Sequence, residues 1–214
     1  MEEGAPIPLV GLTGTFDSSA ALDRNHGLQQ AAEQADVHLH QLISAAWNEQ
    51  EAREKTRILL RRYPDTRGIW SASDGMALGA IQALKDAGKQ PGEDVLVGGV
   101  DWEPRALEAI RDGTLALSFG RHFLEGGAVL LLLDAFHRGE TIFPEDPSPP
   151  MRYPMEPATR ANLDRIERII DPENWDRVDF SRLSADDWRT PDGIIDPEAL
   201  MNSVVSLLAE AEPD

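Results

Sequence analysis

Short apolar runs alternate with longer runs of helical periodicity over the first two thirds of the chain. The apolar runs, rich in Val, Ile and Leu, cover residues 7–13, 37–44, 68–73, 94–101 and 115–120. Stretches with one apolar face at helical spacing cover residues 19–35, 48–63, 74–88, 104–112 and 122–138. A strand followed by a helix, five times over, is typical of a parallel sheet with helices on both faces. The pattern therefore predicts an α/β fold with a doubly wound parallel sheet of about five strands.

Residues at the element boundaries agree with this assignment. Ser18 or Ser19 can cap the first helix, and Asp74 can cap the third, because short polar side chains accept hydrogen bonds from free N–H groups there. Glycines stand where three of the helices are expected to end, at Gly88, Gly113 and Gly139.

The character of the chain changes after Gly139, where the proline-rich run PEDPSPP interrupts it. Residues 140–214 hold 18 acids, 7 arginines and no lysine, so they contribute 11 of the 18 net negative charges. We expect a short strand near 151–155 and helices near 159–170 and 197–211, within a loosely packed acidic, partly helical C-terminal extension. The extension is either a docking segment anchored by Trp175 and Trp188 or, the reading we favour, a solvated appendage that wraps the lobe.

Charge and composition exclude several classes of partner. A formal charge of −18 repels a phosphate backbone, so neither nucleic acid nor an anionic membrane surface is an expected partner. The absence of cysteine excludes disulfides and thiolate metal sites. The longest apolar run, Ala128–Leu133, is too short to span a membrane. The first residues carry acids where an export signal carries Lys or Arg, so we expect no signal peptide on this chain.

Polar residues gather where the predicted strands end. Ligands of open α/β sheets bind at the carboxyl ends of the strands, near the point where strand order reverses. The third, fourth and fifth strands end at Ser73-Asp74, Asp101-Trp102 and Arg121-His122, and Arg24 lies in the helix that follows the first strand. The predicted ligand-binding residues are Arg24, Ser73, Asp74, Asp101, Trp102 and Arg121.

This combination suits a sugar or polyol. Carboxylates and guanidinium groups fork onto adjacent hydroxyls, and an indole covers the apolar face of a sugar ring. Each residue also has an ordinary alternative: pairing of Arg24 with Asp23 or Glu33, helix capping by Asp74, a core position for Trp102, and a surface position for Arg121.

Enzymatic readings have weaker support. His38 and His40 alternate within one strand, but no third metal ligand follows at a suitable spacing. Asp74 and Asp101 could form the carboxylate pair of a glycoside hydrolase, although binding proteins use such pairs simply to accept hydroxyl protons. We assign no catalytic residue, no metal and no cofactor.

Four stretches, SSAALDRNHGL, SASDGMALGAIQALKDAG, VGGVDWEPRALEAIRDG and LALSFGRHFLEGG, resemble successive segments of the type I periplasmic binding proteins, the ribose- and galactose-binding family. The resemblance covers about residues 7–155. It implies binding of a sugar or related polyhydroxylated molecule, a periplasmic location, and an ABC permease or a sensor kinase as partner. The same architecture occurs in the effector-binding domain of LacI-like transcription regulators, which is the alternative function.

The resemblance also assigns roles to residues. Arg24 matches the family's sugar-clamping arginine, Asp101 matches the aspartate that holds ring hydroxyls, and Arg121 lies where ribose-type members have glutamine. Ser73-Asp74, with Trp102 and Arg121, is more similar to the autoinducer-2 receptor branch. The identity of the ligand therefore stays open.

The matching segments correspond to the carboxyl-terminal lobe of the family. We expect residues 1–121 to form this lobe, 122–140 to form a helix that would belong to the missing amino-terminal lobe, and 141–214 to form a returning strand and the acidic extension. One lobe without the other buries less of a ligand's surface, so binding by this chain alone is expected to be weak.

The helix expected at 122–138 carries five large apolar side chains, at Phe123, Val129, Leu130, Leu133 and Phe136. Leaving them in water forfeits several kcal/mol. We expect this helix to fold back on its own lobe, to pair with a second copy as a homodimer, or to meet a separate chain such as the missing lobe.

Overall fold

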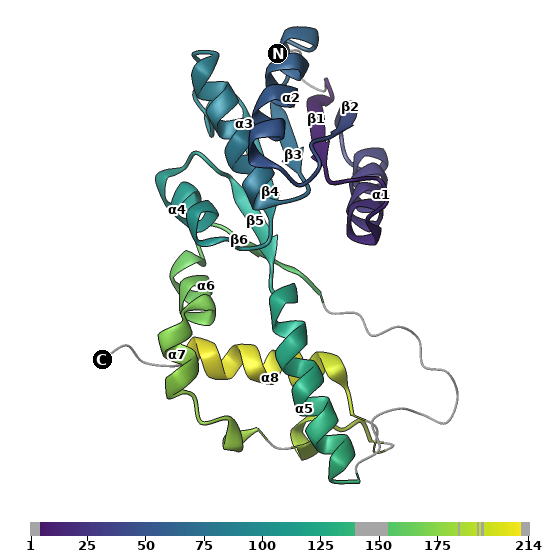
Figure 1. Cartoon of the computed structure of the whole chain (residues 1–214), viewed down its shortest axis with the longest axis vertical. Helices are drawn as coiled ribbons and strands as arrows, with labels where there is room; N and C mark the ends of the chain where they lie inside the picture. The colour runs from purple at the N-terminus through teal and green to yellow at the C-terminus, as the bar shows by residue number, and fades with distance from the viewer. Residues whose placement is uncertain (1–4, 140–153, 184, 192, 194, 211–214) are drawn as a thin grey trace. The chain divides into compact units, whose positions relative to one another are not determined.

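The computed structural model describes residues 5–139, 154–183, 185–191, 193 and 195–210. They form two compact units, coloured along the chain in Figure 1. The first unit comprises the chain up to Gly120 together with Pro157–Ala161, and the second comprises Arg121–Glu156 together with the chain from Asn162 onward.

The first unit is a parallel sheet with helical crossovers, which confirms the predicted fold class. Its elements in chain order are β1 Ile7–Thr13, α1 Ser19–Gln34, β2 Val37–Ser44, α2 Glu49–Arg62, β3 Gly68–Ser71, α3 Asp74–Asp86, β4 Leu96–Val100, α4 Pro104–Asp112 and β5 Leu117–Gly120. The strand order is β2-β1-β3-β4-β5-β6, and β1 to β5 pair in parallel. The sixth strand, β6 (Glu156–Ala158), follows the expected position at 151–155, of which residues 151–153 lie outside the described residues.

Helices lie on both faces of this sheet. Figure 1 shows α1 on one side and α2 with α3 on the other. Gly11 of β1 faces α1, because a Cβ there would lie 3.2 Å from Leu28 Cδ2. The α3 helix approaches α2 closely at Gly79, where a Cβ would lie 2.1 Å from the Glu49 carbonyl oxygen. On the α3 face Ile69 is 1% exposed and Val97 is fully buried, so the core of this unit lies there.

Side chains cap the helices where short polar residues were expected, with one correction. Ser18 caps α1 by accepting a hydrogen bond from the Ala21 N–H. The N-cap of α3 is Ser73, which accepts from the Met76 N–H, so the prediction that Asp74 caps this helix is wrong. Gly88, Gly113 and Gly139 have φ of 72°, 83° and 83°, the left-handed conformation that a glycine after a helix supplies at little cost.

The second unit is helical. It contains the 3₁₀ segment His122–Leu124, α5 Glu125–His137, α6 Leu163–Ile170, α7 Pro172–Arg177, the 3₁₀ segments Phe180–Arg182 and Ala185–Trp188, and α8 Pro197–Glu210. Its buried side chains include Leu132, Ile166, Trp188, Leu200 and Leu208. The expectation of a loosely packed extension is therefore wrong, and Trp188, only 2% exposed, is a core residue rather than a docking anchor. Among the described residues, no helix has both the length and the apolar character needed to cross a membrane.

Candidate ligand-binding site

The carboxyl ends of four neighbouring strands meet at one edge of the first unit's sheet. Strand β1 lies between β2 and β3, so the chain reverses its direction of winding at β1. Such a reversal point is where open α/β sheets bind ligands. The residues that follow these strand ends are Gly14 after β1, Trp47 after β2, Ser73 after β3 and Asp101 after β4.

Arg24 joins two of these strand ends. Its Nη1 donates to the Ala72 carbonyl oxygen at 2.5 Å, and its Nη2 lies 3.2 Å from Asp101 Oδ1. The two side chains are 20% and 26% exposed, so the ion pair is largely shielded yet reachable from solvent. The structure thus shows Arg24 paired with Asp101 across 77 positions of the chain, and not with the nearby acids of its own helix.

Trp47 completes this group, and the sequence reading missed it. The Arg24 guanidinium lies 5.7 Å from the centroid of the indole ring, within the range of a cation–π interaction. The ring occupies the space beside Gly14, where a Cβ would lie 1.8 Å from Trp47 Cε2. Trp47 follows β2 by three residues, just as the predicted site residues follow their own strands. The strand-end rule would have found it if the end of the second strand had been considered with the others.

Backbone strain marks the same edge of the sheet. Among the described residues, the non-glycine residues with positive φ are Ala46 (51°), Trp47 (58°), Asp101 (125°), Trp102 (60°) and Arg121 (90°). Each of them follows the carboxyl end of β2, β4 or β5. Conformations of this kind cost about 1–3 kcal/mol each and are concentrated at binding and active sites. Their distribution independently points to this edge.

A buried hydrogen-bond network supports the strained end of β4. Asp74 is fully buried, and its Oδ2 accepts hydrogen bonds from Ser118 Oγ at 2.8 Å and from the Glu103 N–H at 2.9 Å. Ser118 Oγ in turn accepts from the Trp102 N–H at 3.2 Å. Burial raises the pKa of Asp74 to about 7, and the nearby Asp101 and Glu103 carboxylates add to the rise while the two hydrogen bonds oppose it. Asp74 therefore lies inside the network that holds this strand end, and its predicted contact with a ligand stays a prediction.

Trp102 belongs to the same network. It is 2% exposed, its indole N–H donates to the Ser118 carbonyl oxygen at 3.0 Å, and its ring fills the space beside Gly120. The core position considered as its ordinary alternative is the one observed. Ser73 is 8% exposed and caps α3.

Arg121 lies in the second unit. It is 7% exposed, and its Nη2 donates to Asn202 Oδ1. Desolvation lowers the pKa of this guanidinium, while the Glu156 and Glu198 carboxylates act in the opposite direction. The structure brings Arg24, Trp47 and Asp101 together, with Ser73, Asp74 and Trp102 in the same unit. The predicted contact of Arg121 with a ligand stays a prediction.

Other chemistry finds little support in the described residues. His38 and His40 stack edge to face with centroids 4.7 Å apart, and His40 lies flat on Tyr63. No group of three His, Asp or Glu side chains among the described residues is arranged to hold a metal ion. A glycosidase pair of Asp74 and Asp101 would need two accessible carboxylates, and Asp74 is fully buried.

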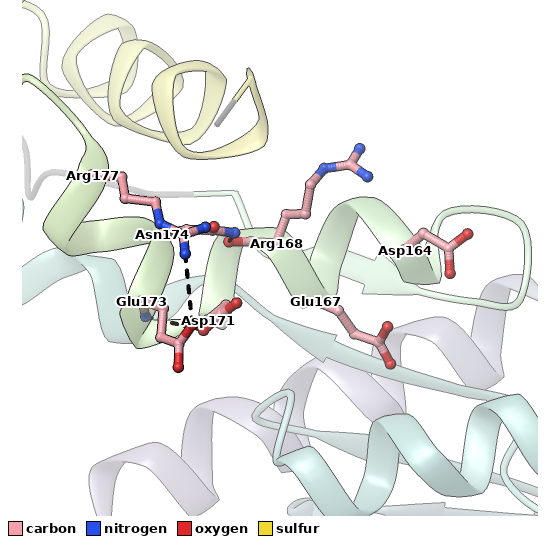
Figure 2. A pocket seen from close by; sticks show the side chains of 7 residues that line it. All are labelled: Asp164, Glu167, Arg168, Asp171, Glu173, Asn174 and Arg177. Carbon is pink, nitrogen blue, oxygen red and sulfur yellow. Dashed lines mark hydrogen bonds and ion pairs between the residues drawn. The ribbon is translucent and has the colours of Figure 1, made fainter. Parts of the chain in front are cut away.

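A cavity of about 500 Å³ lies in the second unit, and it contains none of the predicted site residues. It is lined by Asp164, Glu167, Arg168, Asp171, Glu173, Asn174 and Arg177 (Figure 2). Several of these groups already serve the local fold: Asn174 Nδ2 donates to the Arg168 carbonyl oxygen, and Asp171 caps α7 through the Glu173 N–H. Its open, charged lining gives no reason to prefer it over the strand-end edge.

Comparison with known proteins identifies the class. Residues 3–141 match the model of the periplasmic binding protein domain. Because this match covers well over half of the chain, the protein belongs to the periplasmic binding protein domain family.

Individual relatives agree with this assignment. The chain is 36% identical over 120 residues to the ribose import binding protein of Salmonella typhimurium, covering 56% of this chain and 38% of that protein. It is 30% identical over 166 residues to the xylitol-binding protein of Mycolicibacterium smegmatis, covering 76% of this chain and 45% of that protein. A crystal structure of a periplasmic sugar-binding protein from Pseudomonas fluorescens superposes with a TM-score of 0.73 at 36% identity, covering 87% of this chain and 57% of that one.

The chain thus matches less than half the length of these curated relatives. These matches favour the binding-protein reading over the LacI-like regulator.

Proposed function

We propose that this chain binds a sugar or related polyhydroxylated small molecule at the sheet edge formed by Arg24, Trp47 and Asp101. The observation that carries the proposal is the ion pair of Arg24 with Asp101, at 3.2 Å, beside the partly exposed indole of Trp47. A guanidinium and a carboxylate held side by side present donors and acceptors at the spacing of vicinal hydroxyls. The indole covers the apolar C–H face of a sugar ring.

The remaining residues take two kinds of role in this proposal. Ser73, Asp74 and Trp102 are positioning residues, because they cap α3 and hold the strained Asp101–Trp102 segment through Ser118. Arg121 donates to Asn202 through its Nη2, so a contact with a ligand would use the other N–H groups of its guanidinium. The relatives support the class of ligand, because their names specify ribose and xylitol.

The biological setting follows from the family. We propose that residues up to 121 are one lobe of a substrate-binding component that works with an ABC permease in the periplasm, or of a periplasmic signal receptor. A second lobe would supply the opposite wall of the site. Without it the ligand is enclosed on one side, so affinity in solution is expected to be low.

The test uses ligand-observed NMR saturation transfer on the 214-residue chain with ribose, xylitol and galactose as probes. At least one probe is expected to receive saturation and to be displaced by excess of itself. The Arg24→Ala and Trp47→Ala variants should lose the signal.

The matched control is Arg53→Ala. Arg53 also forms an ion pair with a partly exposed aspartate, Asp86 at 2.7 Å, but on the α2–α3 surface. The Arg53→Ala variant should retain binding of the probe. Absence of saturation with all three probes, or equal loss in the control, would refute the site.

A further inference from the structure

The sheet of the first unit is covered unevenly. Residues paired in register on adjacent parallel strands have side chains on the same face of the sheet. Trp70 of β3 is paired with Gly11 of β1 on one side and with Gly98 of β4 on the other, so these three residues share one face. This is the α1 face, because Gly11 lies under Leu28 of α1. At Gly98, a Cβ would meet only the Leu117 side chain of the neighbouring strand, and no helix.

Five apolar side chains occupy this face over β3, β4 and β5. Val100 is only 6% exposed, and the other four, Trp70, Leu96, Leu117 and Phe119, form what we call the open sheet face. Leu96 is 54% exposed and Phe119 is 40% exposed, whereas their neighbours on the α3 face are buried. Parallel sheets are found almost always with both faces covered. Within the first unit, Leu96 and Phe119 are exposed and Trp70 and Leu117 are partly exposed, so this face is incompletely covered.

A second apolar surface is found on α5. The helix buries Ala128, Leu132 and Ala135 inside the second unit. The opposite side, which we call the apolar α5 face, consists of Phe123 just before the helix and Val129, Leu130, Leu133 and Phe136 within it, each 43–68% exposed. The helix therefore packs into the helical second unit, and it does so through small residues and Leu132 rather than through the five side chains that prompted the three expectations.

We propose that the apolar α5 face of one copy covers the open sheet face of a second copy, reciprocally, in a two-fold homodimer. A helix laid on a sheet is the packing that each surface lacks. The two surfaces hold seven of the twelve large apolar residues that are exposed among the described residues. A two-fold dimer buries both surfaces on both copies by the same contact, used twice.

The area is sufficient for a stable contact. Five large apolar side chains that are each about half exposed present roughly 450 Å². The open sheet face presents less, roughly 300 Å², because Trp70 and Leu117 are only partly exposed. The two reciprocal contacts together bury roughly 1,500 Å², within the standard range for specific interfaces. Because each copy carries a formal charge of −18, repulsion opposes association and salt should strengthen it.

The test is sedimentation velocity of the full 214-residue chain at low and high salt. We expect a dimer whose dissociation constant falls when salt is raised, and a loss of association of at least tenfold in Leu130→Glu and in Phe119→Glu. Ile58→Glu is the matched control, because Ile58 is 46% exposed on α2, outside both surfaces. Circular dichroism checks that each variant is folded.

The chain contains no cysteine, so single introduced cysteines report contacts cleanly. A mixture of the Phe119→Cys and Leu133→Cys variants should form a disulfide between the two chains under mild oxidation. A second variant carries both cysteines, Phe119→Cys and Leu133→Cys, in the same chain. Three results would overturn the proposal: a monomer at all concentrations, a disulfide within one chain of this double variant, or efficient crosslinking of Leu133→Cys to Val129→Cys, which reports helix-on-helix pairing. The proposal does not rest on the ligand, since a dimer that binds no sugar still supports it.

Discussion

Replacing Asp74 with asparagine is expected to stabilise the first unit at neutral pH. The Asp74 carboxyl is fully buried, and only its Oδ2 has hydrogen-bond donors, from Ser118 and Glu103. Its Oδ1 has no partner and lies against Gly99, where a Cβ would be 2.2 Å away. Asparagine has the same shape, can keep both hydrogen bonds through its own oxygen, and carries no charge.

The magnitude follows from linkage between protonation and folding. Burial raises the pKa of Asp74 from 3.8 to about 7, so the folded state holds this proton more tightly than the unfolded state does. The resulting stabilisation is fully present below pH 3.8 and is lost as pH rises through about 7. At about 1.4 kcal/mol per pKa unit, the loss amounts to about 4 kcal/mol. The buried amide NH₂ of asparagine has no acceptor, which costs about 1–2 kcal/mol, so Asp74→Asn should gain about 2–3 kcal/mol at pH 8.

The assay is urea unfolding of both proteins between pH 5 and 8 by circular dichroism, with amide exchange in β3 and β4 reporting the first unit. The free energy of unfolding of Asp74→Asn minus that of the parent should rise with pH across this range. Asp86→Asn is the control of opposite sign, because hydrogen bonds from Arg53, Arg57 and Gln82 lower the pKa of Asp86 to about 2. Asp86→Asn should have a lower free energy of unfolding than the parent, by an amount that does not change between pH 5 and 8. A flat difference for Asp74→Asn would refute the assignment of a buried, protonated carboxyl.

Two further predictions follow from close contacts. Gly79→Ala places a methyl group 2.1 Å from the Glu49 carbonyl oxygen and should destabilise the first unit by more than about 2 kcal/mol. The methyl group of Gly126→Ala meets nothing within 4 Å, so this variant should stabilise α5 by up to about 1 kcal/mol. Equal urea midpoints for the two variants would contradict this prediction. Trp102→Phe leaves the Ser118 carbonyl oxygen without its indole donor and should cost about 1–3 kcal/mol, so an unchanged midpoint in urea would show that this hydrogen bond is not needed.

The elements of the first unit could be predicted from the sequence because short apolar strand runs alternate with longer helical runs, and residues such as Ser18, Gly88 and Gly113 mark several of the boundaries. The boundary errors have local causes. Ser73 and Asp74 are both able to cap a helix, and the sequence does not say which of them does so. What decides is tertiary: Gly99 on the adjacent strand leaves room for the Asp74 carboxyl to enter the core, where Ser118 and the Glu103 N–H receive it.

The candidate site was partly predictable for the same reason. A strand-end rule located Arg24 and Asp101 without any contact information, and the structure shows them paired. It could not say that Trp102 turns inward while Trp47 faces Arg24, because that depends on which indole finds a buried acceptor. On α5 the sequence identified the five large apolar residues, but small residues, Ala128 and Ala135 with Leu132, form the buried side.

The buried hydrogen-bond network is directly connected to the proposed site through the Asp101–Trp102 segment. Asp101 has a φ of 125°, and its N–H donates to the Phe119 carbonyl oxygen at 2.6 Å, while Trp102 beside it is fixed twice to Ser118. Ser118 is also the donor to Asp74. A strained segment persists only when its surroundings over-determine it, and here β5 and α3 supply that constraint. The Arg24–Asp101 pair is thus preorganised before any ligand arrives. Its geometry should respond to the ionisation of Asp74, which is fully buried behind it.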